Sequence, residues 1–298
     1  MARDGLDATL PRPEIDFPGK IISMPPPSMT LQFTKMNGAG NDFVMLDNRD
    51  LKLALTKEQI EKLCDRHRGI GADGLLCVEP ATEGGDFKMR YYNADGGEAE
   101  MCGNGARCFG RFVNHLHGDT LTKIRFETLA GMISAEFEAG QVRINMSAPH
   151  SLKLAQKLPV AGTDLTVHSV NTGVPHAVVF VEDLQNVPVR EWGSGLRYHE
   201  AFKPKGTNAN FAKVLAPGSI AIRTYERGVE DETLACGTGM VACALIHHEL
   251  TGSPSPVSVL VKGGDTLKVG FEEPKKSEYT NVTLFGPADF VFTGSVSI

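Results

Sequence analysis

Several features of common protein classes are missing from this sequence of 298 residues. It has no cluster of lysine and arginine, and its 36 acidic side chains outnumber 30 basic ones, so nucleic acid is not an expected partner. No apolar run approaches the roughly 18 residues that a membrane-spanning helix needs, so we expect no membrane partner. The hydrophobic content of 41% and the charged content of 22% are ordinary for a globular protein.

The cysteines form none of the usual cysteine motifs. The sequence has no C-x-x-C pair, and no histidine and cysteine have a spacing typical of zinc sites, so no metal is expected. No secretory signal is recognisable, so the 6 cysteines do not suggest a disulfide framework. Four of them are expected to be buried apolar side chains: Cys64, Cys77, Cys108 and Cys243. Cys102 and Cys236 differ, because each begins a Cys-Gly-x-Gly segment, in which two glycines flank the second residue after the cysteine.

Residues 1–30 differ in composition from the rest of the chain. The stretch "PRPEIDFPGKIISMPPPSM" is rich in proline and has no amphipathic period, which predicts a mobile extension. It lacks the apolar core of a secretory signal, and its acidic residues are unlike a transit peptide. It is compatible with the remainder of a targeting segment after cleavage.

The sequence contains an internal repeat. "MCGNGARCFG" at 101–110 matches "ACGTGMVACA" at 235–244, and Cys102 and Cys236 are 236 − 102 = 134 positions apart. "NGAGNDFVMLD" at 37–47 has the outline of "NTGVPHAVVFVED" at 171–183, and "RYYNADGGEAEMCGNG" at 90–105 resembles "RTYERGVEDETLACGTG" at 223–239. Three matches in order at a nearly constant offset predict a duplication.

Both halves read as α/β units. A helix is expected over 56–67, where a threonine precedes an acidic first turn, and after each Cys-Gly-x-Gly segment. Strands are expected at 43–48, 74–80, 88–93, 123–131, 132–140, 142–147, 177–183, 219–227, 258–264 and 266–271. The sequence therefore predicts an α/β fold of two pseudo-symmetric domains that arose by duplication, with a site in the cleft between them.

A thiol at such a turn has a specific chemical use. The glycines let the backbone turn tightly and present N–H groups, and the N-terminus of the following helix binds anions and stabilises a thiolate. Two thiols from two halves can face one carbon, so that a thiolate removes a proton from one face and a thiol delivers one to the other. The thiols need unequal protonation, backbone donors would hold an α-carboxylate, and domain closure would exclude water.

Five motifs together resemble diaminopimelate epimerases: "MNGAGNDFVMLDN", "NADGGEAEMCGNGARC", "NTGVPHAVV", "GTNANF" and "YERGVEDETLACGTG". The resemblance runs in order from about residue 31 to the C-terminus. It implies two domains, each a β-barrel-like sheet around a central helix, with the last strand near "DFVFTGSVSI" returning to the first domain. The implied domains are 31–146 plus 287–298, and 147–286.

The resemblance also implies an activity. The reaction would interconvert LL- and meso-2,6-diaminopimelate on the route to lysine, with no cofactor, neither pyridoxal phosphate nor metal. A homodimer is implied, located in the chloroplast stroma in a plant or in the cytoplasm in a bacterium.

The residue roles follow from the motifs that match. Cys102 and Cys236 would be the acid–base thiols, and His176 and Glu226 would tune them. The implied substrate contacts are Asn41, Asn93, Gly103, Asn104, Asn208, Glu226, Arg227, Gly237 and Thr238. The planar fork of an arginine suits the distal carboxylate. Alternative interpretations are a strand-edge histidine for His176, and turn residues for Asn93 and Asn208.

The sequence departs from the common family pattern at three places. Val174 stands where many members have asparagine, Gly74 stands where many have glutamine, and "ERGVEDET" carries an extra residue. Together with the N-terminal extension, these departures look more like plant or cyanobacterial members. The first two positions would lack their usual substrate contacts.

Three other functions compete with this reading. A proline or hydroxyproline racemase would use the same two thiols on a compact substrate, but Arg227 and Asn208 favour a long one with a second carboxylate. A thiol redox protein would use a Cys102–Cys236 disulfide without any amino-acid clamp. An inactive interaction protein would not need two intact thiol motifs.

Overall fold

The first half of the chain forms a mixed sheet around a helix. The computed structural model describes residues 29–298. The strands of this half are β1 (Thr30–Gly38), β2 (Asn41–Asp47), β3 (Gly74–Pro80), β4 (Phe87–Asn93), β5 (Lys123–Thr128), β6 (Gly131–Glu138) and β7 (Gln141–Asn145). β2 pairs with β3 and β4 with β5 in parallel, and the other neighbours pair antiparallel. The helices are α1 (Lys57–Cys64) and α2 (Gly103–Leu116).

The second half repeats this pattern. Its strands are β9 (Thr163–Asn171), β10 (Pro175–Phe180), β11 (Asn208–Ala216), β12 (Ser219–Glu226), β14 (Val257–Leu260), β15 (Thr266–Lys275) and β16 (Glu278–Gly286). β10 pairs with β11 and β12 with β14 in parallel, while the other neighbours pair antiparallel. The helices are α3 (Val189–Arg197), α4 (Gly237–Thr251) and a short 3₁₀ turn (Glu200–Phe202), and a short strand β13 (Asp231–Thr233) lies beside β12. The same order of pairings in both halves confirms the predicted duplication.

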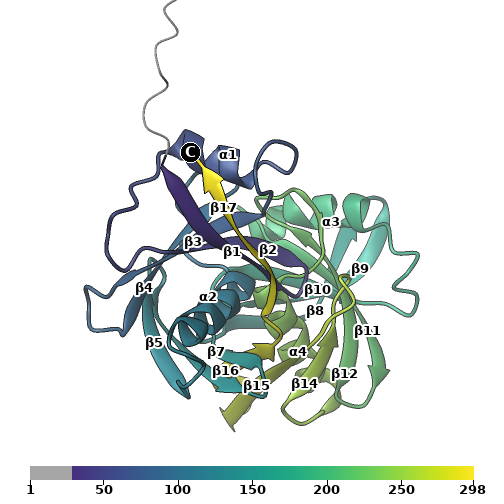
Figure 1. Ribbon diagram of the computed structural model, residues 1–298. Helices are drawn as coiled ribbons and strands as arrows, with labels where there is room; N and C mark the ends of the chain where they lie inside the picture. Colours follow the sequence, from purple (N-terminus) through teal and green to yellow (C-terminus); the bar gives the residue numbers. More distant parts are fainter. Residues whose placement is uncertain (1–28) are drawn as a thin grey trace, which may run out of the picture.

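Three further pairings complete the sheet, and one of them joins the halves. β7 pairs antiparallel with β16 where the halves meet. β17 (Asp289–Ser297) pairs antiparallel with β1, and β8 (His150–Val160) takes the equivalent place beside β9. Figure 1 shows the last strand, in yellow, alongside the first strand, in purple. The C-terminal strand therefore returns to the N-terminal half.

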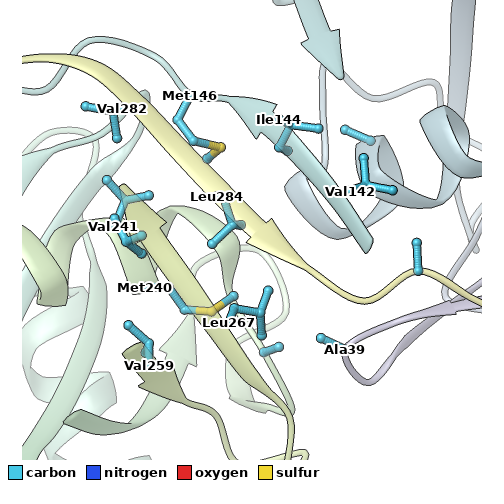
Figure 2. Close-up of a cluster of buried hydrophobic side chains, with 14 of the residues drawn as sticks. Ala39, Val142, Ile144, Met146, Met240, Val241, Val259, Leu267, Val282 and Leu284 are labelled. Atoms are coloured by element: carbon cyan, nitrogen blue, oxygen red, sulfur yellow. The ribbon is translucent and has the colours of Figure 1, made fainter. Parts of the chain in front are cut away.

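The core of each half is built around one helix. α4 packs against β9 to β12 and β14 to β16, and α2 packs against β1, β2, β3, β6 and β7. Residues Met240–His247 of α4 are all buried, as expected of a helix that is surrounded by sheet. A single hydrophobic cluster crosses between the halves, and Figure 2 shows Met146, Val241 and Leu284 within it. The predicted fold class, with a central helix in each domain, is confirmed.

The predicted helix near residue 56 is also confirmed. Thr56 caps α1, its hydroxyl accepts from the backbone of Gln59, and the Gln59 side chain accepts from the backbone of Thr56. All six cysteines are free, and Cys64, Cys77, Cys108 and Cys243 are buried as expected.

Most of the expected N-terminal extension, 1–30, lies outside the described residues. Thr30 already belongs to β1, and the backbones of Met29 and Ile298 exchange hydrogen bonds of 3.1 and 3.0 Å. None of the helices in residues 29–298 has both the length and the apolar character needed to cross a bilayer.

Candidate functional site

The N-termini of α2 and α4 meet where the two halves join. Cys102 is the N-cap of α2, and Cys236 is the N-cap of α4. A β-carbon built on Gly237 would lie 3.6 Å from the Cα atom of Gly103, and one built on Gly103 would lie 3.8 Å from the Cα atom of Gly237. The positive ends of two helices thus point at one place, which favours an anion there.

The two cysteine turns have similar backbones and different hydrogen bonds. Both cysteines are extended, with φ of −132° at Cys102 and −127° at Cys236. The sulfur of Cys102 accepts from the backbone N–H of Gly105 at 3.5 Å, whereas the sulfur of Cys236 lies 3.6 Å from the hydroxyl of Thr238. The carbonyl of Thr238 accepts from the Thr172 hydroxyl at 3.0 Å, which fixes the second turn.

Burial raises the pKa of both thiols, and the Glu226 carboxylate acts in the same direction on each. The backbone N–H groups at the two helix starts lower the pKa of each thiol, as does the charge of Arg107 for Cys102. Glu226 itself has a raised pKa because it is buried, and it accepts a hydrogen bond of 2.9 Å from the hydroxyl of Thr233. The two thiols and the Glu226 carboxyl are therefore all weaker acids than usual, so each of them can hold a proton.

His176 lies in β10 and is only 1% exposed. Burial, aided by the charge of Arg227, lowers the pKa of His176 to about 3, so the ring is neutral near pH 7. The Asn210 amide donates to Nδ1 at 3.1 Å, which leaves the ring hydrogen on Nε2. Nε2 has no hydrogen-bond partner within the part of the chain described. It is a free donor at a buried position.

Asn210 was not predicted from the sequence. Its oxygen accepts from the Thr224 hydroxyl at 2.9 Å, so its NH₂ group is turned toward His176. A β-carbon on Gly239 would lie 2.4 Å from that oxygen, which explains why only glycine fits there. The signal was present in "TNANF", because residues two apart on a strand share one face.

Asn208 and Arg227 form one unit in the second half. The Asn208 amide donates to the carbonyl of Pro175 at 3.1 Å and accepts from the backbone N–H of Arg227 at 2.8 Å. Asn208 therefore positions its neighbours. The guanidinium of Arg227 donates to the carbonyl of Lys205 at 3.2 Å, and it pairs with no carboxylate among residues 29–298. It retains donors for the carboxylate of a ligand.

Asn41 and Asn104 connect the first half to the second. Asn104 follows Gly103 in α2, and its NH₂ group donates to the Asn41 oxygen at 2.6 Å and to the carbonyl of Ala235 at 3.5 Å. The NH₂ group of Asn41 donates to Asp73 at 2.9 Å. These bonds fix the orientation of both amides beside the cysteine turns.

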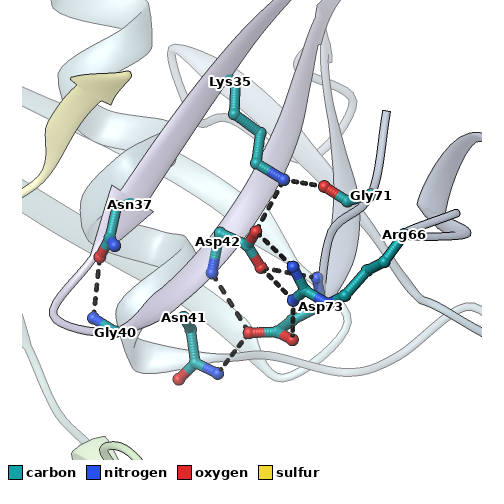
Figure 3. A network of polar contacts seen from close by, with 8 residues as sticks. All are labelled: Lys35, Asn37, Gly40, Asn41, Asp42, Arg66, Gly71 and Asp73. Carbon is teal, nitrogen blue, oxygen red and sulfur yellow. Dashed lines mark hydrogen bonds and ion pairs between the residues drawn. The ribbon is translucent and has the colours of Figure 1, made fainter. Parts of the chain in front are cut away.

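An ion network anchors Asn41 from the other side (Figure 3). Arg66 lies 2.7 Å from both Asp42 and Asp73, and Lys35 lies 2.7 Å from Asp42 and also contacts the carbonyl of Gly71. Burial alone would raise the pKa of Asp42, but the hydrogen bonds from Arg66 and Lys35 lower it to about 2. The Asp42 carboxylate therefore stays ionised, and the network holds the β1–β2 turn.

Asn93 is the predicted residue that the structure connects least. It is exposed at the end of β4, opposite Gly74, and its backbone closes the turn to Gly96 and Gly97. Its side chain forms no hydrogen bond to another described residue. Val174, the second departure from the family pattern, contributes its carbonyl to the Thr172 N–H at 3.1 Å.

The ring of Tyr91 fills the space beside Gly74. A β-carbon on Gly74 would lie 2.7 Å from Cε2 of Tyr91 and 2.6 Å from the carbonyl oxygen of Tyr92. Tyr91 is 8% exposed and packs edge-on against Phe43, with ring centroids 6.2 Å apart. Its hydroxyl finds no hydrogen-bond partner in the described chain. The sequence did not predict that a ring would occupy this place.

Within residues 29–298, no three His, Cys, Asp or Glu side chains gather in a way that could hold a metal ion. The structure thus brings together, at the start of α2 and α4, Cys102, Cys236, Gly103, Gly237, Asn104, Asn41 and Thr238. The paired strands β10, β11 and β12 carry His176, Asn208 and Glu226 respectively. Arg227 is the residue that follows β12.

Sequence comparison places these residues in a family context. The family model described as Diaminopimelate epimerase matches residues 33–151 and 168–290. The diaminopimelate epimerase of Aquifex aeolicus (strain VF5) is 45% identical over 280 residues, covering 90% of this chain and 98% of that protein. The diaminopimelate epimerase of Cyanothece sp. (strain PCC 7425 / ATCC 29141) is 39% identical over 285 residues, covering 89% of this chain and 99% of that protein.

Solved structures of low sequence identity share the fold. A phenazine biosynthesis protein of the PhzF family from Bacillus anthracis has a TM-score of 0.70 at 16% identity, covering 91% of this chain and 100% of its own. A hydroxyproline epimerase from Agrobacterium vitis has a TM-score of 0.67 at 15% identity, covering 90% of this chain and 91% of its own. This likeness concerns architecture alone.

Proposed function

The chain belongs to the diaminopimelate epimerase family and epimerises LL-2,6-diaminopimelate to the meso isomer in lysine biosynthesis, and we propose that Cys102 and Cys236 are its two acid–base groups. The observation that carries this proposal is the meeting of two cysteine-capped helix N-termini at Gly103 and Gly237. The racemase alternative rests on a likeness of fold alone, and the family match is to a different activity.

In the proposed reaction, one sulfur starts as a thiolate and the other as a thiol. The thiolate forms an S–H bond with the proton of the α-carbon, and the electron pair of the broken C–H bond moves onto the α-carbon and its carboxylate. The thiol then gives its proton to the opposite face of that carbon and becomes the thiolate. The products are the inverted stereocentre and a pair of thiols with exchanged protonation, which exchange with water restores.

The carboxylate of the reacting carbon would lie between the two helix starts. The donors we assign to it are the turns at Gly103, Asn104, Gly237 and Thr238, because charge that develops on the carboxylate is stabilised by N–H groups already aimed at it. The closeness of Gly103 and Gly237 supports this assignment, since a β-carbon on either glycine would be in van der Waals contact with the Cα atom of the other.

The distal end of the substrate would be bound by the second half. Arg227 is assigned to the distal carboxylate, and its freedom from carboxylate partners among the described residues supports that role. Asn208 holds the backbone of Arg227 in place. Glu226, Asn41 and Asn93 are assigned to the amino groups, where a positive charge would favour ionised Glu226. For His176, the neutral ring with a free Nε2–H supports a role as donor to a thiolate.

We also propose a homodimer. Phe290, Val291 and Phe292 in β17 are 38%, 55% and 48% exposed, and adjacent exposed apolar side chains are typical of an interface. A second copy of this chain is the proposed occupant. Light scattering should give the mass of a dimer for the parent chain and of a monomer for Phe292→Asp; a parent monomer would contradict the proposal.

For domain organisation we propose the division into 31–146 plus 287–298, and 147–286, which the pairing of β17 with β1 supports. We propose the chloroplast stroma as the location if the source is a plant, and the cytoplasm if it is a bacterium; the cyanobacterial relative is compatible with either source. The formal net charge of −6 supports the absence of a nucleic-acid partner.

The assignment of the thiols is tested by turnover under reducing conditions. The parent chain, Cys102→Ala and Cys236→Ala are incubated with LL-diaminopimelate, and the isomers are resolved by chromatography. We expect the parent to form the meso isomer and each variant to lose nearly all activity with its fold intact. Cys243→Ala is the matched control, because Cys243 is a buried cysteine of the same helix. Substantial activity in either of the two variants would overturn the two-thiol assignment.

A further inference from the structure

Arg107 is a buried cation that the proposed reaction does not use. It lies in α2 five residues after Cys102, as 107 − 102 = 5, and it is 0% exposed. No carboxylate in the described chain pairs with it. Burying a charge is unfavourable unless it is hydrogen-bonded, and a buried charge without a counter-ion keeps its field. A residue with these properties calls for a functional explanation.

The guanidinium ties two distant segments of the chain to the start of α2. It donates to the carbonyl of Pro287, between β16 and β17, at 3.2 Å, and to the carbonyl of Gly38, at the end of β1, at 3.1 Å. It also donates to the carbonyl of Gly103 at 3.4 Å, within the turn of Cys102. Arg107 thus holds the cysteine turn against the strand that returns from the second half.

Arg107 also fixes the side chain of Asn104. Nη2, which also donates to Gly38, donates to the Asn104 oxygen at 3.1 Å. This bond directs the NH₂ group of Asn104 toward Asn41, at 2.6 Å, and toward the carbonyl of Ala235, the residue before Cys236. The Asn41 oxygen and the Ala235 carbonyl already require the NH₂ end of the amide on their side, and the bond from Arg107 holds the opposite, oxygen end.

The second half of the duplication lacks this charge. The position equivalent to Arg107 in α4 is Val241, since 241 − 236 = 5. Val241 is 0% exposed and lies inside the apolar cluster that Figure 2 shows. The two cysteine turns are alike in backbone and unlike in the charge behind them.

We infer that Arg107 is a positioning residue that locks the Cys102 turn and Asn104, and that its charge makes Cys102 the thiolate of the resting pair. This inference deepens the proposed function and rests on the assignment of both thiols. It explains how a duplicated site obtains the unequal protonation that a two-thiol reaction needs.

The other groups that face Cys102 are Cys108 of α2, Tyr91 of β4, Glu226 at the end of β12, and Cys236 at the start of α4. Burial raises the pKa of Tyr91, Cys236 and Cys108, the last to about 12, so these three are neutral near pH 7. Glu226 disfavours a thiolate at both cysteines, and Arg107 favours one at Cys102. The charge of Arg107 therefore favours the thiolate of Cys102 and not that of Cys236.

The test measures the protonation of each thiol without turnover. Iodoacetamide reacts with the thiolate, and mass spectrometry of the peptides gives the alkylation rate of each cysteine as a function of pH. In the parent chain, we expect the midpoint for Cys102 to lie below that for Cys236. In Arg107→Met the midpoint for Cys102 should rise by about one pH unit, which is about a tenfold slower alkylation below the midpoint.

Two variants separate charge from shape. Arg107→Lys keeps the charge and loses the fork, so the Cys102 midpoint should stay close to that of the parent while kcat falls, because Asn104 is freed. Val241→Met makes a change of similar size at the equivalent position of α4 and should move the Cys102 midpoint by less than about a third of a unit. Thermal unfolding establishes that each variant is folded.

An unchanged Cys102 midpoint in folded Arg107→Met would overturn the inference, as would a parent chain in which Cys236 titrates before Cys102. The second comparison needs no variant, so it decides even if Arg107→Met does not fold. The proposed function fails separately: if Cys102→Ala or Cys236→Ala remains active, the two-thiol assignment is wrong whatever the alkylation shows.

Discussion

The Asn208 side chain accepts a hydrogen bond from the backbone N–H of Arg227 at 2.8 Å, and this bond connects β11 to the residue after β12. It fixes the backbone from which the one guanidinium assigned to the distal carboxylate extends. The sequence motifs predict that both residues contact the substrate. In the structure, Asn208 uses one N–H and one lone pair to position its neighbours, and Arg227 keeps free donors.

Arg227→Lys should lower kcat/KM for LL-diaminopimelate by roughly a hundredfold, because a lysine keeps the charge and loses the planar fork that orients the substrate. Alkylation of Cys102 and Cys236 should be unaffected. Arg190→Lys is the matched control: Arg190 is exposed and paired with Asp231 at 2.6 Å, so kinetics should match the parent. Parental kinetics for Arg227→Lys would remove Arg227 from the distal-carboxylate role.

The buried His176 predicts a loss of stability in acid. Its pKa is lowered from the usual 6.5 to about 3 by burial, so the folded state stays neutral where the unfolded state takes up a proton. That contribution is complete above pH 6.5 and is lost as the pH falls from 6.5 toward 3. Between about pH 7 and about pH 5, denaturant titration should show the parent losing about 2 kcal/mol more than His176→Asn.

His67→Asn serves as the control for this measurement, because it makes the same substitution at an exposed histidine. Equal slopes for the parent and His176→Asn would show that the ring is not held neutral in the folded state.

Gly74→Gln should destabilise the chain and should not restore a family contact. The new β-carbon would meet Tyr91 at 2.7 Å and the backbone of Tyr92 at 2.6 Å, so β3 and β4 would have to move. Overpacking of this kind reduces the free energy of unfolding by about 1–3 kcal/mol. Gly84→Ala is a useful comparison, because nothing lies within 4 Å of that position and only its φ of 92° is unfavourable. A fully stable, more active Gly74→Gln would contradict this account.

Mild oxidation should inactivate the enzyme by linking Cys102 to Cys236, and dithiothreitol should restore it. The two helix starts are close, since a β-carbon built on Gly237 would lie 3.6 Å from the Cα atom of Gly103, so modest movement should bring the sulfurs to bonding distance. Peptide mapping identifies the linked pair, and Cys243→Ala should be inactivated like the parent. Inactive protein with another pair linked, or with none, would argue against convergent thiols.

The sequence predicted those parts of the fold that depend on local pattern. The Thr56–Gln59 capping box and the two Cys-Gly-x-Gly helix starts carry their structure within a few residues. α3 was missed, because "VREWGSGLR" contains two glycines, which disfavour a helix. They are there for packing: β-carbons on Gly193 and Gly195 would lie 2.4 Å from Tyr225 and 2.6 Å from Val160. β8 was missed because most of its residues are exposed.

The same division applies to the site. The duplication predicted both cysteines and the glycines beside them, because these belong to one short motif. Three other residues act through contacts with residues distant in the sequence. Asn210 donates to His176, Tyr91 fills the space beside Gly74, and Arg107 donates to Pro287. Such contacts exist only after the strands have paired. Of the three residues, only Asn210 had a local signal, its place two residues after Asn208 in "TNANF".

The origin of the new proton tests the two-thiol account most directly. LL-diaminopimelate is incubated in heavy water, and mass spectra of substrate and product are taken before about a tenth of the approach to equilibrium. Because the donating thiol exchanges with solvent before substrate binds, and because Cys102 and Cys236 belong to separate halves, early product should carry deuterium at the inverted carbon while remaining substrate stays unlabelled. Substantial unlabelled product, or label in the substrate before inversion, would mean that one group serves both faces and would contradict the account even if both cysteines proved essential.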